Sequence, residues 1–232
     1  MSQFIAGDGT VSKSNVFDLL GPIMVGPSSS HTAGAVRLGT MARKILGEEP
    51  LEGVITLHGS FAQTGKGHGT NLALIAGLLG MSPDDERIPE APKLAQEQGL
   101  KIRFETDDLG DVHPNTVKFN LTGSMGTIQV VGSSIGGGAI LIRQINNFMV
   151  DINGDYPTLV ILHQDLPGVV AQVTLLLATA QINIATMRVS REKKGAQALM
   201  VLETDQKIDE AVLGLTRRLP SVKQALAIEP LE

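Results

Sequence analysis

The sequence contains neither cysteine nor tryptophan, and aromatic residues make up only 3% of it. Because it has no thiols, the chain forms no disulfide, offers no cysteine nucleophile and supplies no thiolate to an iron–sulfur cluster. Any such cofactor must therefore be held by a partner. Glycine, in contrast, occurs 26 times, so few side chains can stack on bases and many positions let the backbone approach a ligand closely. This balance favours a small polar ligand.

Basic clusters and long apolar runs are also missing. The formal net charge is -5, and the lysines and arginines form no block, which argues against a surface built for nucleic acid. No apolar run approaches the ~18 residues that cross a bilayer, and the first residues lack the order of a signal peptide. We therefore expect a cytoplasmic protein that binds neither nucleic acid nor membrane.

The length and the hydrophobic content bound the number of domains. The chain has 232 residues, of which 42% are hydrophobic and 19% are charged, which suffices for one large domain or two small ones. Turn-forming residues cluster at 153–157 between two apolar runs, a composition that is typical of a linker. We predict two domains, at residues 1–152 and 157–232.

The second of these domains has regularly alternating patterns. Apolar or alternating runs of strand length flank two segments with apolar residues at helical spacing. The expected elements are a strand at 158–163, a helix at 169–180, a strand pair at 185–190 and 198–202, a helix at 208–215 and a strand at 222–228. The order βαββαβ is that of a ferredoxin-like fold.

The first domain is less regular. The expected helices lie at 32–46, ending at Gly47, and at 71–79 and 93–98, and the expected strands lie at 54–57, 101–105, 116–121, 127–131 and 139–145. This mixture predicts an α+β domain with a mixed or antiparallel sheet.

The segment GPSSSHT at residues 26–32 leads directly into the first helix. Its free backbone N–H groups and hydroxyls meet at the positive end of the helix dipole, an arrangement that suits a carboxylate or phosphate. The candidate ligand-binding residues are Ser28, Ser29, Ser30 and Thr32, with His31 as a proton-transfer group or ligand donor. The alternative is that one serine is a helix N-cap, worth about 1 kcal/mol, and that the others contact solvent.

A second glycine-rich stretch, HGS at 58–60 followed by TGKGHGT at 64–70, leaves a strand and enters a helix. Its spacing fits neither the phosphate loop of nucleotide-binding proteins nor the dinucleotide fingerprint. What remains is Lys66 and two histidines on mobile backbone, which fits either small-anion binding or a flexible turn with a solvated lysine. Because His58 and His68 lack metal-ligand spacing and nearby carboxylates, we assign no metal site.

Polar residues also border the first helix of the second domain. His163 and Asp165 lie between its first strand and that helix, and Asn183 opens the second strand nearby. Such groups at a helix amino terminus suit the carboxylate and ammonium of an amino acid. They also fit a capping turn, in which Asp165 bonds the first helical N–H groups and Asn183 serves the helix-to-strand connection. Both roles can hold together.

Three motifs give the whole chain a specific resemblance. They are FDLLGPIMVGPSSSHTAGAVRLG at 17–39, HGSFAQTGKGHGTN at 58–71 and VGSSIGGG at 131–138. With them the chain resembles the beta subunit of bacterial iron–sulfur-dependent L-serine dehydratases (L-serine ammonia-lyases) of the two-subunit type. The first domain is similar to the allosteric substrate-binding domain of phosphoglycerate dehydrogenases, and residues 157–232 resemble an ACT regulatory domain.

This resemblance implies an enzyme that converts L-serine to pyruvate and ammonia with a [4Fe–4S] cluster whose exposed iron acts as a Lewis acid. In the family the cluster ligands lie on the alpha subunit, which agrees with the absence of cysteine here. His31 is then the candidate catalytic residue of this chain, although the base that removes the Cα proton lies on either subunit. The residues that would hold the substrate carboxylate or orient His31 are Ser28, Ser29, Ser30 and Thr32, and those that would line the same cleft are Lys66 and His68.

For the second domain the resemblance implies amino-acid contacts by His163, Asp165 and Asn183 at an interface between two ACT domains. Asp165 replaces the neutral amide of the dehydrogenase version, so the domain either binds serine or serves only for self-association. The competing interpretation of the whole chain is a non-catalytic amino-acid-sensing regulatory module. A self-sufficient hydrolase or kinase has little support, because neither a nucleophile elbow nor a phosphate loop is present.

Overall fold

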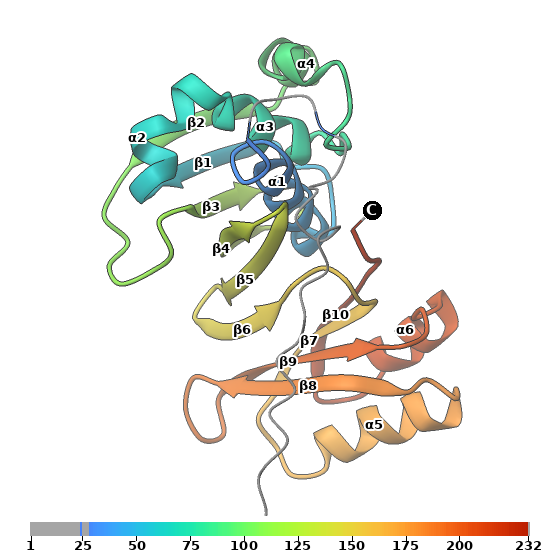
Figure 1. Cartoon of the computed structure of the whole chain (residues 1–232). Coiled ribbons are helices and arrows are strands. Elements are labelled where there is room, and N and C mark those ends of the chain that lie inside the picture. The colour runs from blue at the N-terminus through green and yellow to red at the C-terminus, as the bar shows by residue number, and fades with distance from the viewer. Residues whose placement is uncertain (1–23, 25–27, 232) are drawn as a thin grey trace, which may run out of the picture.

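Two β-sheets, one from each half of the chain, organise the structure (Figure 1). It is a computed structural model that describes residue 24 and residues 28–231. The first sheet has six strands and the second has four, and helices pack against both, so the α+β class expected from the sequence is confirmed. None of the helices in the described residues combines the length and the apolar composition needed to cross a membrane.

The first half builds the six-stranded sheet in the order β2-β1-β3-β4-β5-β6. Its strands are β1 (Glu52–Leu57), β2 (Lys101–Thr106), β3 (Thr116–Thr122), β4 (Thr127–Gly136), β5 (Ala139–Ile145) and β6 (Phe148–Ile152). Its helices are α1 (Ala33–Leu46), α2 (Gly59–His68), α3 (Thr70–Leu78), the short 3-10 helix η2 (Ile88–Glu90) and α4 (Ala91–Glu97). β1 and β2 are parallel and the other neighbours antiparallel, so the sheet is mixed.

Two elements of this half differ from the sequence expectation. The expectation of mobile backbone or a flexible turn at 64–70 is wrong, because these residues belong to α2 and the start of α3, with Gly69 in the left-handed conformation between them. The strand β6 was not predicted, although its residues alternate between buried and exposed positions, with Phe148, Val150 and Ile152 buried. That alternation is the signature of a half-buried strand.

The second half forms the ferredoxin-like βαββαβ order, as expected. Its elements are β7 (Thr158–Gln164), α5 (Val169–Thr179), β8 (Ile184–Arg191), β9 (Gln197–Thr204), α6 (Glu210–Arg217) and β10 (Val222–Ile228). The strands pair antiparallel in the order β10-β7-β9-β8. The turn cluster at 153–157 lies between β6 and β7.

Helix α1 packs against α3 and β4. It ends at the expected residue, Gly47, which is left-handed (φ 80°) and donates its N–H to the carbonyl of Arg43. Where α1 crosses α3, a Cβ atom on Gly39 would lie 3.1 Å from Gly77 Cα, and one on Gly77 would lie 2.7 Å from the backbone nitrogen of Thr40. The two helices therefore meet backbone to backbone.

The two halves share a hydrophobic core. Val160, Leu199, Val201 and Ile228 of the second sheet are buried in the same cluster as the strands and helices of the first half. The helices α5 and α6 enclose a separate core with other residues of that sheet. The second half is therefore packed against the first rather than tethered to it.

We expect the substitution Gly77→Ala to destabilise the protein by about 2 kcal/mol or more, because the new methyl group would meet backbone atoms of α1 that cannot move aside. Urea denaturation of the purified chain measures the change in the free energy of unfolding. The matched control is Gly214→Ala in α6, where a Cβ atom would meet nothing within 4 Å, and where alanine should stabilise the helix by up to ~1 kcal/mol. Equal stability of the two variants would contradict this account of the α1–α3 contact.

Candidate functional site

The imidazole of His31 lies at the centre of a cluster of hydroxyl groups. Its Nε2 atom is 3.0 Å from Thr64 Oγ1 and 3.3 Å from Ser60 Oγ, and its Nδ1 atom is 3.3 Å from Ser28 Oγ. Only 9% of the residue is exposed. Both ring nitrogens are thus bonded to hydroxyls, which come from segments about thirty residues apart in the sequence.

The turn before α1 holds His31 in this place. The carbonyl of Ser28 accepts the N–H of Thr32 at 2.8 Å, and the carbonyl of Ser29 accepts the N–H of Gly34 at 2.9 Å. The Ser28 hydroxyl accepts the backbone N–H of His31 at 3.4 Å. The N-cap residue of α1 is Thr32, and its side chain accepts no hydrogen bond from the first backbone N–H groups of the helix in the described structure. The alternative of a serine N-cap is therefore wrong.

Ser28, Ser29 and Ser30 are each partly exposed. A ligand or a partner protein can therefore contact the turn. Thr32, in contrast, is buried, and its hydroxyl has no hydrogen-bond partner among the described residues. The first motif begins at Phe17, and its residues before Ser28, apart from Met24, lie outside the described residues.

Helix α2 brings the other hydroxyls to His31. Gly59, with φ 54°, lets the chain leave β1 and turn into α2 close to Pro114. Ser60, Thr64 and His68 then follow at intervals of four residues, so they lie in a row along one face of the helix. Ser60 and Thr64 were not among the residues predicted from the sequence, because their spacing has meaning only if the glycine-rich segment is helical.

His68 completes this row and lies beside His31. Its ring centroid is 4.9 Å from that of His31, and its Nδ1 atom donates to the carbonyl of Thr64 at 3.1 Å. Phe61 closes the other side, with its ring edge-on to His31. The prediction for Lys66 concerns a side chain that lies outside the described part of the structure.

The environment of His31 favours its neutral form. Burial lowers the pKa of His31 below its ordinary value of 6.5, and electrostatic repulsion from His68 lowers this pKa further, whereas a hydrogen bond with the backbone of Ser60 acts in the opposite direction. A neutral imidazole has a lone pair on one nitrogen and can therefore accept a proton.

The third motif lies against the start of α1 as well. A Cβ atom on Gly34 would lie 2.8 Å from Ser134 Cβ, so only glycine allows α1 to approach β4 here. Ser133 contributes a 2.7 Å hydroxyl–hydroxyl hydrogen bond with Thr116. The three glycine-rich motifs of the sequence are therefore assembled around one helix terminus.

Several buried oxygen atoms of these motifs have no hydrogen-bond partner among the described residues. They are the hydroxyl oxygens of Thr32, Thr70 and Ser134 and the amide oxygen of Asn71. Buried polar atoms are normally paired with protein, water or ligand. Thr32 and Ser134 both lie at the start of α1, since Ser134 contacts Gly34, and their hydroxyls, which are unpaired among the described residues, indicate a site for a small polar or anionic molecule.

In the second half, His163 and Asp165 lie at one end of the sheet. Only 2% of His163 is exposed, its Nδ1 atom is 2.8 Å from the carbonyl of Gln164, and its Nε2 atom is buried without a partner in the described chain. Asp165 accepts the N–H of Gly195 at 3.0 Å and pairs with Arg191 at 3.3 Å. The hydrogen bond from Gly195 contributes most to holding the pKa of Asp165 below its usual value, and Arg191 lowers this pKa further.

Two expectations for this region are wrong. Asp165 does not cap α5, because its carboxylate is engaged by the β8–β9 turn, and the N-cap of α5 is Gly168. Asn183 does not lie near His163: it precedes β8 at the end that pairs with Thr204, whereas His163 pairs with Ala198 at the opposite end of β9. Asn183 instead bonds Asp205. These residues can share a site only if two copies of the domain contribute to it.

No group of three or more histidine, aspartate or glutamate side chains that could hold a metal ion is present in the described residues. The candidate site therefore consists of an imidazole, hydroxyls and backbone N–H groups. Such a set can bind an anion and move a proton.

Comparison with known proteins gives these motifs a family context. The family model for the serine dehydratase beta chain matches residues 15–144, and that for the ACT domain matches residues 158–221. The chain is 44% identical to the probable L-serine dehydratase, beta chain, of Bacillus subtilis (strain 168), over 92% of this chain and 97% of the relative. It is 41% identical to the L-serine dehydratase, beta chain, of Peptoniphilus asaccharolyticus, over 88% and 94%. A D-3-phosphoglycerate dehydrogenase of Bacillus subtilis is 27% identical over 84% of this chain and 37% of the dehydrogenase.

We expect the substitution His68→Gln to raise the pKa of His31, because it removes the electrostatic interaction with His68 that lowers this pKa. Titration of the histidine ring signals by NMR measures this pKa directly. His113→Gln, at an exposed loop position, is the control and should leave the pKa of His31 unchanged. An unaltered His31 titration in the His68 variant would show that the two rings are not electrostatically coupled.

Proposed function

Since this chain belongs to the serine dehydratase beta chain family, we propose that it is the beta subunit of an L-serine ammonia-lyase, which converts L-serine to pyruvate and ammonia together with an alpha subunit. Both beta-chain relatives carry L-serine dehydratase names and align over nearly their whole length. The observation that carries the proposal is the environment of His31: a nearly buried imidazole with a lowered pKa, bonded to hydroxyls, at a turn whose serines are partly exposed.

The [4Fe–4S] cluster that the family resemblance implies has no suitable ligands in this chain. The sequence contains no cysteine, and no other group of metal ligands is found in the described residues. The cluster would therefore be held by the alpha subunit, and the His31 turn would approach it across the subunit interface.

In the proposed reaction His31 removes the Cα proton of serine, and the β-hydroxyl group leaves as water after taking up one proton, which balances the proton that His31 has gained. The resulting aminoacrylate rearranges to an imine, which water hydrolyses to pyruvate and ammonia. A neutral imidazole with a free lone pair is suited to this proton transfer. The hydroxyl partners of His31 keep its ring in one orientation.

The substrate carboxylate would bind at the start of α1. The partly exposed hydroxyls of Ser28, Ser29 and Ser30 and the backbone N–H groups of the helix terminus are suited to an anion. The buried hydroxyl of Thr32, which has no partner among the described residues, would be satisfied by the same ligand. Lys66 and His68 would line the cleft from α2.

We expect His31→Asn to lower the turnover of the enzyme assembled with its alpha subunit by about a hundredfold or more, the usual range for loss of a general base. A pyruvate assay under anaerobic conditions measures the turnover, and the cluster absorbance of the assembled enzyme should be unchanged. The control His113→Asn should retain full turnover. Near-normal turnover of the His31 variant would remove His31 from the mechanism.

A second candidate function is amino-acid sensing by the ACT domain, either beside catalysis or instead of it. The observation that favours it is the buried Nε2 atom of His163, which has no partner among the described residues, next to the charged Asp165. Because Asn183 lies at the other end of the sheet, the sensing site would need two domains and hence self-association.

We expect Asp165→Asn to strengthen the binding of L-serine, because the substitution removes a negative charge that repels the carboxylate of the amino acid. Isothermal titration of L-serine into the full chain and into the variant compares the two affinities. If neither protein binds serine at millimolar concentration, the domain serves only for self-association. If serine binds but leaves the turnover of the assembled enzyme unaffected, the sensing role is separate from catalysis.

A further inference from the structure

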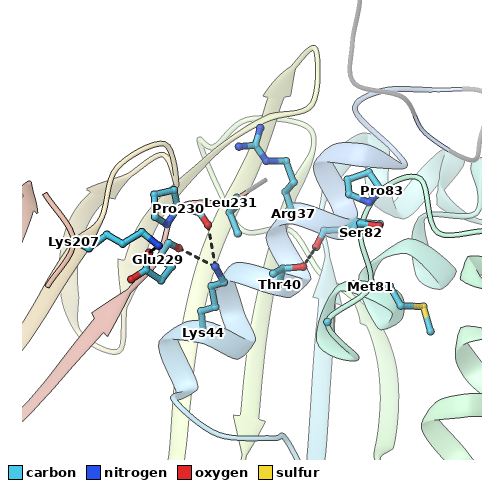
Figure 2. A pocket seen from close by; sticks show the side chains of 12 residues that line it. Arg37, Thr40, Lys44, Met81, Ser82, Pro83, Lys207, Glu229, Pro230 and Leu231 are labelled. Atoms are coloured by element: carbon cyan, nitrogen blue, oxygen red, sulfur yellow. Dashed lines mark hydrogen bonds and ion pairs between the residues drawn. The ribbon is translucent and has the colours of Figure 1, made fainter. Parts of the chain in front are cut away.

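A pocket of about 510 Å³ lies where the two halves of the chain meet (Figure 2). Helix α1 forms its floor through Arg37, Thr40 and Lys44. The turn at 80–83, after α3, forms one wall, and Lys207 with residues 229–231 forms the other. We call it the junction pocket. Its volume falls within the range of small-molecule sites, roughly 300–1,000 Å³.

The lining of the junction pocket carries an excess of positive charge. Arg37, Lys44 and Lys207 line it together with a single carboxylate, that of Glu229. Arg37, Thr40 and Lys44 share one face of α1, because they follow at helical spacing, and Figure 2 shows them between the C-terminal segment and residues 81–83. In a chain with a net charge of -5, this concentration of cations is a local feature that favours an anion.

The lysines of the pocket connect the two halves. Lys44 Nζ donates to the backbone carbonyls of Glu229, at 2.8 Å, and of Pro230, at 3.1 Å. Lys207, which belongs to the second half, forms a 2.8 Å ion pair with the carboxylate of Glu229. The segment after β10 is therefore tied to α1 on one side and to the second half on the other.

The guanidinium group of Arg37 makes longer contacts than the lysines do. Its Nη1 atom donates to the carbonyl of Gly138 at 3.3 Å, and its Nη2 atom pairs with Asp155 at 3.4 Å. Both distances are longer than the roughly 2.7–2.9 Å of strong charge-assisted bonds. Its Nε atom is buried and has no partner among the described residues. An arginine with N–H groups still to satisfy is suited to a planar or tetrahedral oxyanion, which it can bind with two adjacent donors.

We propose that the junction pocket binds a small oxyanion with two negative charges, a dicarboxylate or a phosphate, that joins the two halves of the chain. Arg37 recognises the oxyanion through the remaining N–H groups of its two amino nitrogens, and Lys207 adds a positive charge, shared with Glu229, from the opposite wall. The hydroxyls of Thr40 and Ser82 line the space between them. This ligand is separate from the serine of the proposed reaction, and its binding does not depend on that reaction.

The test uses the full chain without any partner. Inorganic phosphate and malonate are titrated separately by calorimetry at constant ionic strength, with sodium chloride as the balancing salt. We expect saturable binding of at least one dianion, and a dissociation constant at least tenfold larger in Arg37→Gln and in Lys207→Gln. Binding of phosphate alone identifies a phosphate ligand, binding of malonate alone identifies a dicarboxylate, and binding of both supports the shared dianion chemistry.

The matched control is Lys101→Gln. Lys101, like Lys207, has a largely exposed side chain and pairs with one glutamate, at 3.2 Å, but it lies outside the junction pocket. Its substitution should leave the affinity unchanged. The proposal is overturned if neither dianion binds saturably, or if the Lys101 variant loses as much affinity as the Lys207 variant. Lys207→Gln decides the outcome if Arg37→Gln does not fold, because the Lys207 side chain makes only an exposed ion pair.

A second measurement tests whether the ligand joins the halves. The backbone N–H of Leu231 donates to the carbonyl of Gly154 at 2.8 Å, so its hydrogen exchange reports on the attachment of the C-terminal segment. We expect the bound dianion to slow this exchange in the native chain and to have no effect at the same concentration in Lys207→Gln. Unchanged exchange in the native chain with the dianion bound would overturn the joining role.

Discussion

The close approach of helix α1 to its neighbours is the constraint on which the other features depend. Gly39 and Gly77 leave no room for a side chain where α1 crosses α3, and Gly34 leaves none where α1 meets β4. At Gly39 and Gly77 the opposing atoms belong to the backbone and cannot move aside as a flexible side chain can, so the α1–α3 contact fixes the helix in one position. The His31 turn precedes the helix and the junction pocket lies on its exposed face. The location of both sites therefore depends on the three glycines that allow this close packing, Gly34, Gly39 and Gly77.

Most of the fold could be predicted because burial leaves a periodic record in the sequence. The apolar positions of α1, of strands β1 to β5 and of the whole second half follow helical or alternating spacing, and these elements lie close to where they were expected, whereas β6 was missed. The helix α2 could not be predicted, because its glycines disfavour a helix. It forms because Phe61, which is fully buried, anchors it to the core. The missed hydroxyls of Ser60 and Thr64 are a consequence of that missed helix. The misplacement of Asn183 has another cause, since strand register cannot be read from one strand alone.

The choice of hydroxyls as partners for His31 has a chemical consequence. A hydroxyl either donates or accepts a hydrogen bond, so Ser28 and Thr64 can reorient when the ring gains or loses a proton. A carboxylate in their place would accept only, and would raise the pKa of His31 by stabilising the charged ring. The cluster therefore allows proton transfer in either direction while burial keeps the resting ring neutral.

The two sites on α1 provide a direct route between the halves of the chain. Residues of the second half reach α1 through Lys44, which bonds the segment that follows β10. The contact at Gly39 lies between this segment and the His31 turn. The helix is held there by backbone atoms, which leave no space for a side chain between α1 and α3. The turn that carries His31 and the lysine that bonds the segment after β10 therefore belong to one helix that is fixed between them.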